Sequence, residues 1–282
     1  MTDLLYSDVE EDLRASVRDL FADKAAAASV LARTESDEPY DLKLWRTAAA
    51  ELGLAGLHVP EELGGQGASA RELAVVLEEL GRAVVPMPFL GSAVLATSAL
   101  LACDTDEAAG LLRRLASGEV TGALAVPLTT WPGSPFPATV SAAGDVLDGR
   151  IGLVADASVA EVLVVPATGP GGPALYAVRD FSATEVTSLD LTRRLADVVL
   201  DKASGTQLAS GEAAVRALAG ALTTGAGLLA SEQVGVAQWC LDETVAYVKQ
   251  RYQFGRPVGS FQALKHRLAD LYLELIQARA TA

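Results

Sequence analysis

The spacing of hydrophobic residues changes twice along the 282-residue chain, and this change constrains the fold more than any other feature. Up to about residue 120, and again after about residue 210, apolar residues recur every three or four positions, the period of an amphipathic helix. Between them, short β-rich runs alternate with Gly, Pro, Asp and Ser, as in a small antiparallel barrel or sandwich. This order predicts an α+β protein of three domains: an all-α domain (1–120), a β-barrel (121–210) and a C-terminal helical bundle (211–282).

The charge balance excludes several classes of partner. Acidic residues outnumber basic ones by 36 to 22, which gives a net charge of −14, and half of the residues are hydrophobic. Phosphate backbones and anionic lipid surfaces attract clustered cations, so neither nucleic acid nor a membrane surface is expected as a partner. The high apolar content excludes intrinsic disorder.

Cysteine and histidine are scarce. Cys103 and Cys240 lie far apart in apolar stretches, which predicts two buried, reduced thiols and excludes a disulfide scaffold. His58 and His266 are the only histidines, so no metal site is predicted. The acidic N-terminal segment does not resemble a secretory signal, and we therefore expect a cytoplasmic protein.

Residues 83–103 carry no charge and are long enough to span a bilayer. Pro86 and Pro88 would break a helix at its start, and small polar residues lower the hydrophobicity further on. We interpret the stretch as a proline turn followed by a buried helix from about Leu90, and we predict no membrane span.

Local signals predict where helices begin and end. Gly53 follows one helical pattern and Gly81 another, each as a residue that terminates a helix. Ser69 with Glu72 three positions later forms a capping box that opens a helix.

A long helix is predicted from Gly211 to Lys249, and a second from Ser260. The second carries an apolar seam with gaps of three and four residues, as in a bundle. No Gly or Pro stop signal precedes Ala282, so we expect the bundle to be incomplete. The seam consists of Phe261, Leu264, Leu268, Leu271 and Leu275.

Five sequence segments carry a family resemblance. Residues 251–257 (RYQFGRP), 260–262 (SFQ) and 266–270 (HRLAD) are similar to the R-x-x-F-G…F-Q…L-A-D motif of acyl-CoA dehydrogenases. Residues 56–67 (GLHVPEELGGQG) and 78–82 (EELGR) resemble the same family. The resemblance covers the whole chain, most clearly at its two ends. It implies an acyl-CoA dehydrogenase-like fold, and FAD-dependent α,β-dehydrogenation of an acyl thioester.

The C-terminal block contains the candidate cofactor-binding residues. Arg251 ends one predicted helix and Gln262 lies in the first turn of the next, so both lie at the same end of a helical hairpin. A guanidinium there can bind a pyrophosphate in bidentate fashion. The resemblance implies that Arg251, Phe254 and Gln262 contact FAD bound mainly by a neighbouring subunit. The alternative is that Arg251 caps helix carbonyls and Gln262 is solvated.

Two blocks depart from the family pattern. Family members present a T-E-P-x-x-G-S-D segment to flavin and substrate, whereas residues 124–132 (LAVPLTTWP) retain only the proline recognisably. The family's W-x-T/S pair, which flanks the flavin ring, corresponds to Leu153 and Ala155. The barrel therefore lacks both a stacking ring and a hydroxyl donor.

No catalytic residue is assigned. The family reaction requires a carboxylate that removes the α-proton of the thioester. Most members have it in a C-terminal segment not present in this chain. Others have it on the long helix, where counting back from Arg251 gives Gly225, and no acid lies between Glu212 and Glu232. Glu232 is interpreted as a surface or capping carboxylate.

Three functions stay open. The chain is one subunit of a heteromeric acyl-CoA dehydrogenase that lends cofactor contacts to a second, similar subunit. Alternatively, it is a self-sufficient FAD enzyme that pairs with itself and acts on an unusual thioester, such as a carrier-protein thioester or a steroid side chain. The third possibility is a flavin-free scaffold subunit. The resemblance further implies acyl-CoA or another acyl thioester as substrate and electron-transfer flavoprotein as oxidant.

Overall fold

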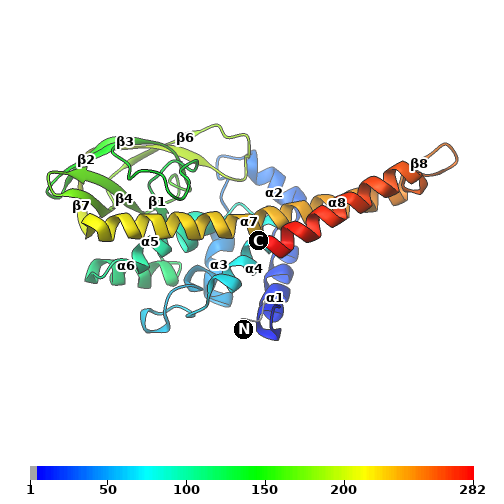
Figure 1. Ribbon diagram of the computed structural model, residues 1–282, viewed down its shortest axis with the longest axis horizontal. Helices are drawn as coiled ribbons and strands as arrows, with labels where there is room; N and C mark the ends of the chain where they lie inside the picture. The colour runs from blue at the N-terminus through cyan, green and yellow to red at the C-terminus, as the bar shows by residue number, and fades with distance from the viewer. Residues whose placement is uncertain (1–4) are drawn as a thin grey trace. The chain divides into compact units, whose positions relative to one another are not determined.

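The computed structural model describes residues 5–282, and helices precede and follow the strands along the chain, as predicted (Figure 1). The positions of the domain boundaries stay predictions. The helices are α1 (Asp8–Lys24), α2 (Ala27–Thr34), α3 (Leu42–Leu52), α4 (Ala70–Ala83), α5 (Thr97–Leu101), α6 (Asp106–Ala116), α7 (Gly211–Gln250) and α8 (Gln262–Thr281). The strands are β1 (Gly122–Leu124), β2 (Val140–Ala143), β3 (Val146–Ala155), β4 (Val162–Gly169), β5 (Gly172–Val178), β6 (Ser182–Val186), β7 (Leu195–Ser210), β8 (Tyr252–Gln253) and β9 (Arg256–Pro257).

The chain divides into two compact units, which we describe separately. The barrel unit comprises Ala28–Leu73 and Pro86–Ala226. The hairpin unit comprises Met1–Ala27, described from Leu5, together with Ala74–Val85 and Gly227–Ala282.

In the barrel unit, strands β1 to β7 form a sheet that closes on itself. β4 pairs with β2 and β5, β5 pairs with β7, and β3 joins β7 to β2. β1 lies beside β4, and β6 beside β7. The predicted barrel is thus present, but it is not wholly antiparallel, because β1 and β2 both run parallel to β4. The prediction rested on the spacing of the β-rich runs, and spacing does not determine strand direction. Small and branched side chains fill the interior, among them Val140, Leu147, Leu163, Val165 and Val198.

The stretch interpreted as a proline turn and buried helix is confirmed. After the prolines, a π-helical segment (Phe89–Ala96) continues directly into α5, and every residue of the segment is buried. Phe89 packs edge-on against Trp45 of α3, with ring centroids 6.4 Å apart.

Asp156, directly after β3, is a buried carboxylate that joins three parts of the barrel unit. Its Oδ1 accepts a hydrogen bond from the Tyr40 hydroxyl at 2.7 Å, and its Oδ2 accepts one from the Gly91 backbone N–H at 2.9 Å. Burial raises the pKa of this carboxyl, although the nearby Arg193 charge and the two hydrogen bonds oppose that shift. Because each of its oxygens accepts a hydrogen bond from a different segment, Asp156 holds the loop before α3 and the π-helical segment against the barrel.

In the hairpin unit, two glycines allow α4 and α7 to cross closely. A Cβ at Gly81 would lie 2.0 Å from the Glu232 carbonyl oxygen, and one at Gly235 would lie 1.9 Å from that of Glu78. The prediction that Gly81 ends its helix is therefore wrong, since α4 continues to Ala83. The glycine is used for backbone approach instead of a left-handed turn. The other local signals are confirmed: Gly53 ends α3 in the left-handed conformation, and Glu72 accepts hydrogen bonds from Ser69.

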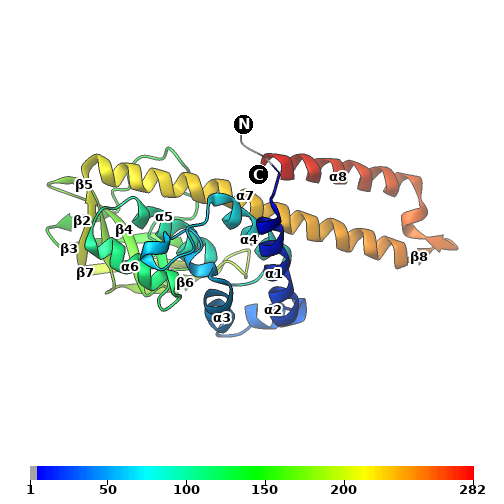
Figure 2. The same ribbon diagram turned by 90° about the horizontal axis from the view of Figure 1, so that it is seen from below.

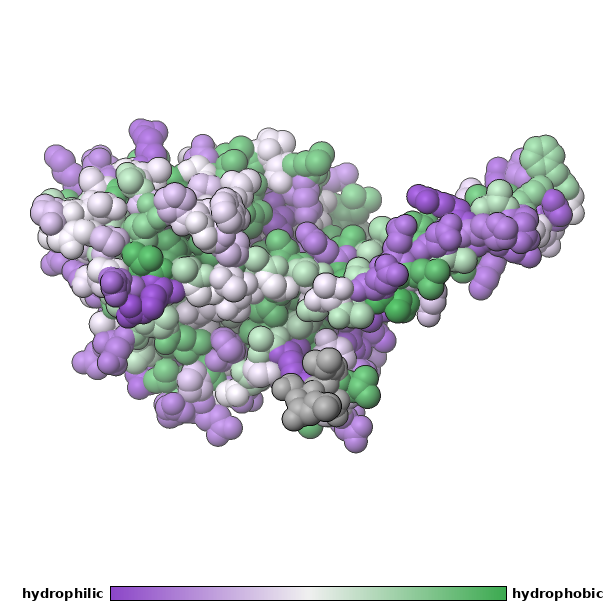
Figure 3. All heavy atoms as spheres, viewed as in Figure 1, coloured by the Kyte–Doolittle hydropathy of each residue, from purple (hydrophilic) through white to green (hydrophobic). Residues whose placement is uncertain are grey.

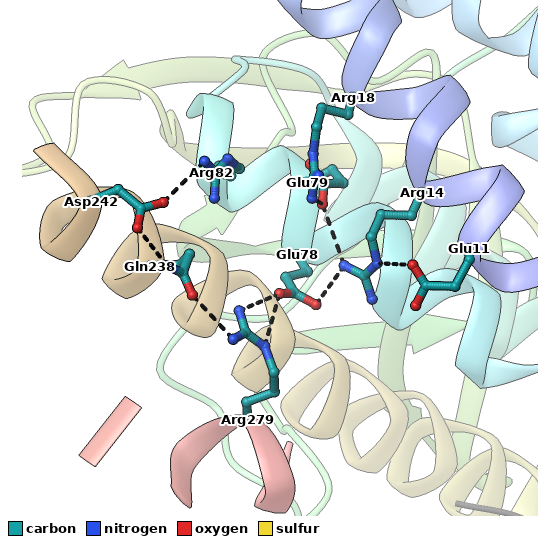
Figure 4. A network of polar contacts seen from close by, with 9 residues as sticks. All are labelled: Glu11, Arg14, Arg18, Glu78, Glu79, Arg82, Gln238, Asp242 and Arg279. Atoms are coloured by element: carbon teal, nitrogen blue, oxygen red, sulfur yellow. Dashed lines mark hydrogen bonds and ion pairs between the residues drawn. The ribbon is translucent and has the colours of Figure 1, made fainter. Parts of the chain in front are cut away.

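A network of charged side chains connects α1, α4, α7 and α8 of this unit (Figure 4). Glu78 accepts from Arg14 at 2.8 Å and from Arg279 at 2.7 Å. Glu79, only 2% exposed in its side chain, accepts from Arg18 at 2.6 Å. Burial alone would raise the pKa of Glu78, but the guanidiniums of Arg14 and Arg279 outweigh it and lower the pKa below 4.5. The ionised carboxylate thus holds together helices that are far apart in sequence.

The two thiols differ in exposure. Cys240 is exposed on α7, so the prediction of two buried thiols is wrong for it. Burial raises the pKa of the half-buried Cys103 thiol to about 11.

Helix α7 is long and apolar enough to meet the length and composition criteria for a membrane span, which core helices of soluble proteins meet as well.

We expect Glu78→Gln to lower the free energy of unfolding by about 2 kcal/mol at neutral pH, because two partly buried guanidiniums lose their ionic partner. The folded-state pKa of Glu78 is depressed, so its contribution exists above the unfolded-state value and is lost as the pH falls through the folded-state value. Urea unfolding should therefore show a difference from wild type that shrinks below about pH 4. Glu212→Gln is the control, because this side chain is 95% exposed. A difference that persists unchanged in acid would contradict the role of ionised Glu78.

At Asp156 we expect alanine and asparagine to differ. Asp156→Ala removes the acceptor of the Gly91 N–H and the closer acceptor of the Tyr40 hydroxyl, leaves a cavity, and should cost about 3 kcal/mol. Asp156→Asn should cost less than about 1 kcal/mol, because the amide oxygen still accepts from Gly91 and the amide nitrogen can donate to the Tyr40 oxygen. The Tyr40 hydroxyl then donates to the Arg194 carbonyl, now 3.4 Å away. Equal losses in thermal unfolding for both variants would refute this account.

A candidate cofactor-binding hairpin

The loop between α7 and α8 is a short β-hairpin in the hairpin unit. β8 pairs with β9 through Tyr252 with Pro257 and Gln253 with Arg256, and the two-residue turn between them is Phe254-Gly255. Both turn residues have positive φ, 53° and 75°. Such a turn matches the twist of a hairpin but favours Asn and Gly, so an aromatic residue there strains the backbone.

Phe254 is held in this strained position with 90% of its surface exposed. Its ring meets the edge of Phe261 at 6.2 Å between centroids and an interplanar angle of 88°. The Arg256 guanidinium lies 3.9 Å from the centre of the Phe261 ring. The hairpin therefore presents one free aromatic face and supports it with a second ring and a cation.

Arg251 follows α7 directly, and its backbone is fixed on both sides. Its N–H donates to the Tyr247 carbonyl at 2.9 Å, and its carbonyl accepts from Val258 at 2.7 Å. Gly259 packs so closely that a Cβ there would lie 3.0 Å from Val248. The Arg251 side chain is exposed, and within residues 5–282 we find no hydrogen bond or ion pair of its guanidinium. The alternative role in capping helix carbonyls is therefore not seen.

Gln262 is the first residue of α8, and its side-chain amide lies 2.7 Å from the His266 imidazole. Arg251 and Gln262 thus lie on either side of the β-hairpin, and Phe254 lies in its turn. The hairpin connects one end of α7 to one end of α8, and the two helices run antiparallel (Figure 2). Their role in binding FAD stays a prediction.

The surface around the hairpin is strongly cationic. No Asp or Glu occurs between residues 244 and 269, although the chain as a whole carries a net charge of −14. The net charge of the whole chain hides this local reversal, which is visible only when the acids are counted along the sequence. The five cations, all exposed, are Lys249, Arg251, Arg256, Lys265 and Arg267.

The helices that carry the hairpin leave apolar surface uncovered. Of the seam predicted along α8, only Leu275 is buried, and Leu264 is 36% exposed. Cavities of about 380 and 770 Å³ lie between α7 and α8, lined by residues such as Leu241, Val245, Leu268 and Leu271. In Figure 3, the tip of the hairpin at the right is hydrophobic and is bordered by hydrophilic side chains. This pair of helices therefore exposes a groove lined by apolar side chains.

In the barrel unit, the structure joins the two segments that depart from the family pattern. Pro127 forms a β-bridge with Val154, and the Leu128 N–H donates to the Leu153 carbonyl at 2.9 Å. Leu153 lies in a bulge with a φ of 57° and is 38% exposed, whereas Ala155 is buried. Neither the Leu153 nor the Ala155 side chain can stack on a flavin ring or donate a hydrogen bond to it.

The position on α7 that corresponds to a base is Gly225, which lies beside the side chain of Leu95. A Cβ at Gly225 would lie 2.4 Å from Leu95 Cδ2. A carboxylate could occupy this position only if Leu95 moved.

The two units differ in how well their residues suit FAD. The hairpin offers an unpaired guanidinium, a free aromatic face and an amide, which together suit a pyrophosphate and a flat ring. The barrel edge offers none of these groups at Leu153 or Ala155. In the described residues, no three His, Cys, Asp or Glu side chains are placed to bind a metal.

Comparison with known proteins agrees with this geometry. The model for the acyl-CoA dehydrogenase N-terminal domain matches residues 7–119, and that for the C-terminal domain matches residues 215–282. The acyl-CoA dehydrogenase IpdE2 of Mycobacterium tuberculosis is 41% identical over 95% of this chain and 72% of its own length. The IpdE2 of Mycolicibacterium smegmatis is 40% identical over 97% of this chain and 75% of its own length.

Two solved structures share the fold and are named as pairs of chains. A variant of the Tcur3481-Tcur3483 steroid ACAD superposes with a TM-score of 0.81 at 32% identity, over 96% of this chain and 77% of its own. The ChsE4-ChsE5 complex of Mycobacterium tuberculosis gives 0.84 at 26% identity, over 98% and 76%. The predicted fold class is confirmed, and the chain belongs to the acyl-CoA dehydrogenase family.

Proposed function

We propose that this chain is a subunit of a heteromeric, FAD-dependent acyl-CoA dehydrogenase that desaturates an acyl thioester between its α- and β-carbons. Its hairpin contributes contacts to an FAD held mainly by a second, acyl-CoA dehydrogenase-like subunit. The observation that carries this proposal is the contrast between a hairpin equipped to bind a cofactor and a barrel edge that is not.

This chain's part in the reaction is binding and orientation. Arg251 would hold the pyrophosphate through two parallel N–H donors, Gln262 would add an amide donor, and Phe254 would cover an aromatic ring. FAD, when bound, accepts the hydride from the β-carbon. Because no acid lies between Glu212 and Glu232 on the long helix, we propose that the base that removes the α-proton does not come from this part of α7.

The relatives and the surface support the choice of partner and substrate class. Two similar structures are named as pairs of different chains, and the uncovered seam on α8 offers an interface for such a partner. One of them is named a steroid ACAD, so we propose a bulky acyl group. Electron-transfer flavoprotein as oxidant and a cytoplasmic location stay predictions.

Co-expression tests the proposal directly. The chain is produced alone and together with an acyl-CoA dehydrogenase-like chain encoded beside it, and the flavin absorbance of each purified sample is measured. We expect a yellow complex that reduces on addition of acyl-CoA, and no flavin on the chain alone. A yellow, active homodimer would instead indicate a self-sufficient enzyme, and a colourless complex would indicate a scaffold.

We expect Arg251→Ala to weaken FAD retention in the complex by about ten- to a hundredfold, the loss typical of a charged hydrogen-bonding group. Arg251→Lys should recover only part of it, because an ammonium lacks the planar fork. Arg216→Ala is the control, since this side chain is 71% exposed and lies in the barrel unit. Equal retention by the alanine variants, measured by ultrafiltration, would remove Arg251 from the site.

The strain at Phe254 predicts a trade-off between stability and binding. Phe254→Asn should raise the free energy of unfolding by about 1 kcal/mol, because Asn tolerates positive φ, and should lower FAD retention, because the ring is lost. Phe254→Leu should lower retention without the gain in stability. An asparagine variant that melts below wild type would show that Phe254 does not strain the backbone.

A further inference from the structure

A groove between α7 and α8 exposes apolar side chains of the hairpin unit. It holds the cavity of about 770 Å³ and is lined at its centre by Val245, Leu268 and Ala269. Tyr272, which also lines it, is 54% exposed. Apolar surface exposed in this way marks a site of interaction. We call this surface the α7–α8 groove.

The charges of the α7–α8 groove lie at its two ends and have opposite signs. Lys249 of α7 and Lys265 of α8 line the end next to the β-hairpin. Asp242, about two helical turns away on α7, lines the other end, where it accepts from Arg82 at 3.0 Å and from Gln238 at 2.8 Å. A carboxylate has about four acceptor sites, so Asp242 can accept from a further cation. A complementary partner therefore presents a carboxylate at one end of the groove and a cation at the other.

The α7 side of the groove is complementary to a second copy of itself. Asp242 and Lys249 lie at equal distances in sequence on either side of the neighbours Val245 and Ala246. A second α7, laid antiparallel so that its Val245 lies beside Ala246 of the first, brings Lys249 of each copy to Asp242 of the other. Such a face is self-complementary about a two-fold axis.

The α8 side repeats this pattern. Lys265 and Tyr272 lie at equal distances in sequence on either side of Leu268 and Ala269. The two-fold axis places each Leu268 beside an Ala269, a large side chain against a small one, and each Lys265 beside the ring of a Tyr272. Because both helices line one cavity, a single axis serves both. Since α7 and α8 are themselves antiparallel (Figure 2), two copies together form a four-helix bundle.

We propose that two copies of this chain pair through the α7–α8 groove in a two-fold symmetric four-helix bundle. Thirteen residues line the groove, fewer than the ~20–30 residues that each side of a typical stable interface contributes. The expected dimer is therefore a weak one, with a dissociation constant on the order of 10 μM.

This pairing goes beyond the proposed function and does not depend on it. Arg251, Phe254 and Gln262 do not line the α7–α8 groove, so they stay available for FAD. Leu271 and Leu275 line the other cavity between the two helices, which leaves them to the second subunit. Two copies, each with its own second subunit, then form an assembly of four chains.

The first test measures the mass of the purified full chain alone by sedimentation equilibrium, between about 1 and 100 μM. We expect an equilibrium between monomer and dimer. Lys249→Asp should weaken it about tenfold or more, because two carboxylates then face each other at both ends of the bundle. Arg267→Asp is the matched control: it makes the same change in charge on an exposed residue of α8 that does not line the groove, and should leave the equilibrium unchanged.

A charge swap tests the two-fold symmetry. Asp242→Lys alone should also weaken the dimer, because two cations then meet at both ends. An equimolar mixture of the Lys249→Asp and Asp242→Lys chains should restore it, since every cation faces a carboxylate in the mixed pair. Circular dichroism of each variant establishes first that it is folded.

A disulfide test needs neither charge change. In chains that carry Cys240→Ser, Ala246→Cys places two thiols close to the two-fold axis, where mild oxidation should join the copies. Thr244→Cys is the control, because this residue lines the other cavity and should give no cross-linked dimer. Cys103 is common to both chains and cannot account for a difference between them.

The outcomes separate this inference from the proposed function. A chain that stays monomeric up to about 100 μM, a dimer that Lys249→Asp leaves unchanged, or folded swap variants whose mixture stays monomeric would overturn the pairing and leave the proposed function intact. If the chain alone is monomeric and Lys249→Asp abolishes binding of the co-expressed second subunit, the groove belongs to that subunit, which also overturns the pairing. A yellow, active homodimer that Lys249→Asp dissociates would keep the pairing and overturn the proposed function.

Discussion

The hairpin unit depends on one carboxylate, Glu78, held between two guanidiniums. Arg14 comes from α1 and Arg279 from the last turns of α8, so a single buried charge fixes the start and the end of the chain to α4. A buried carboxylate is stable only while its partners remain, which makes the three helices interdependent. The close crossing of α4 and α7 at Gly81 and Gly235 adds α7 to the same assembly. Because α8 is anchored at this end, its other end can carry a hairpin that makes few contacts of its own.

The features of the hairpin each cost the isolated chain some stability. Phe254 occupies a left-handed conformation that its side chain disfavours, and its ring is left in water. The Arg251 side chain gains nothing from a partner in the described chain, and the exposed cations between residues 244 and 269 have no carboxylate in the same stretch of sequence. Strain and unbalanced charge of this kind are concentrated where proteins bind ligands. They are explained if the cost is recovered on binding an anion with an aromatic ring.

The sequence predicted those elements that local rules determine. The long helix from Gly211, the left-handed stop at Gly53 and the capping box at Ser69 depend on neighbouring residues only. Gly81 fits the local rule for a helix end, but a glycine is required there because the α7 backbone at Glu232 approaches it closely. Asp156 and Tyr40, 116 residues apart, offered no local signal at all. At the hairpin, the motif identified Arg251, Phe254 and Gln262, but neither the strain at Phe254 nor the contact with His266 follows from spacing. Both depend on backbone and side-chain conformation.

The barrel edge and the hairpin differ in a way that bears on the division of labour. At the barrel edge, the residues that replace a stacking ring and a hydroxyl are apolar, and the bulge at Leu153 is stabilised by Asp197, which accepts from its N–H at 3.1 Å. At Gly225, the side chain of Leu95 lies beside the position that corresponds to a base. At the barrel edge, the Leu153 N–H already has its hydrogen-bond partner within the chain. In the hairpin, by contrast, the Arg251 guanidinium has no partner among the described residues. A self-sufficient flavoenzyme would need unpaired binding groups at the barrel edge as well. The distribution of strain and unpaired charge therefore favours a subunit that lends binding groups to a cofactor held elsewhere.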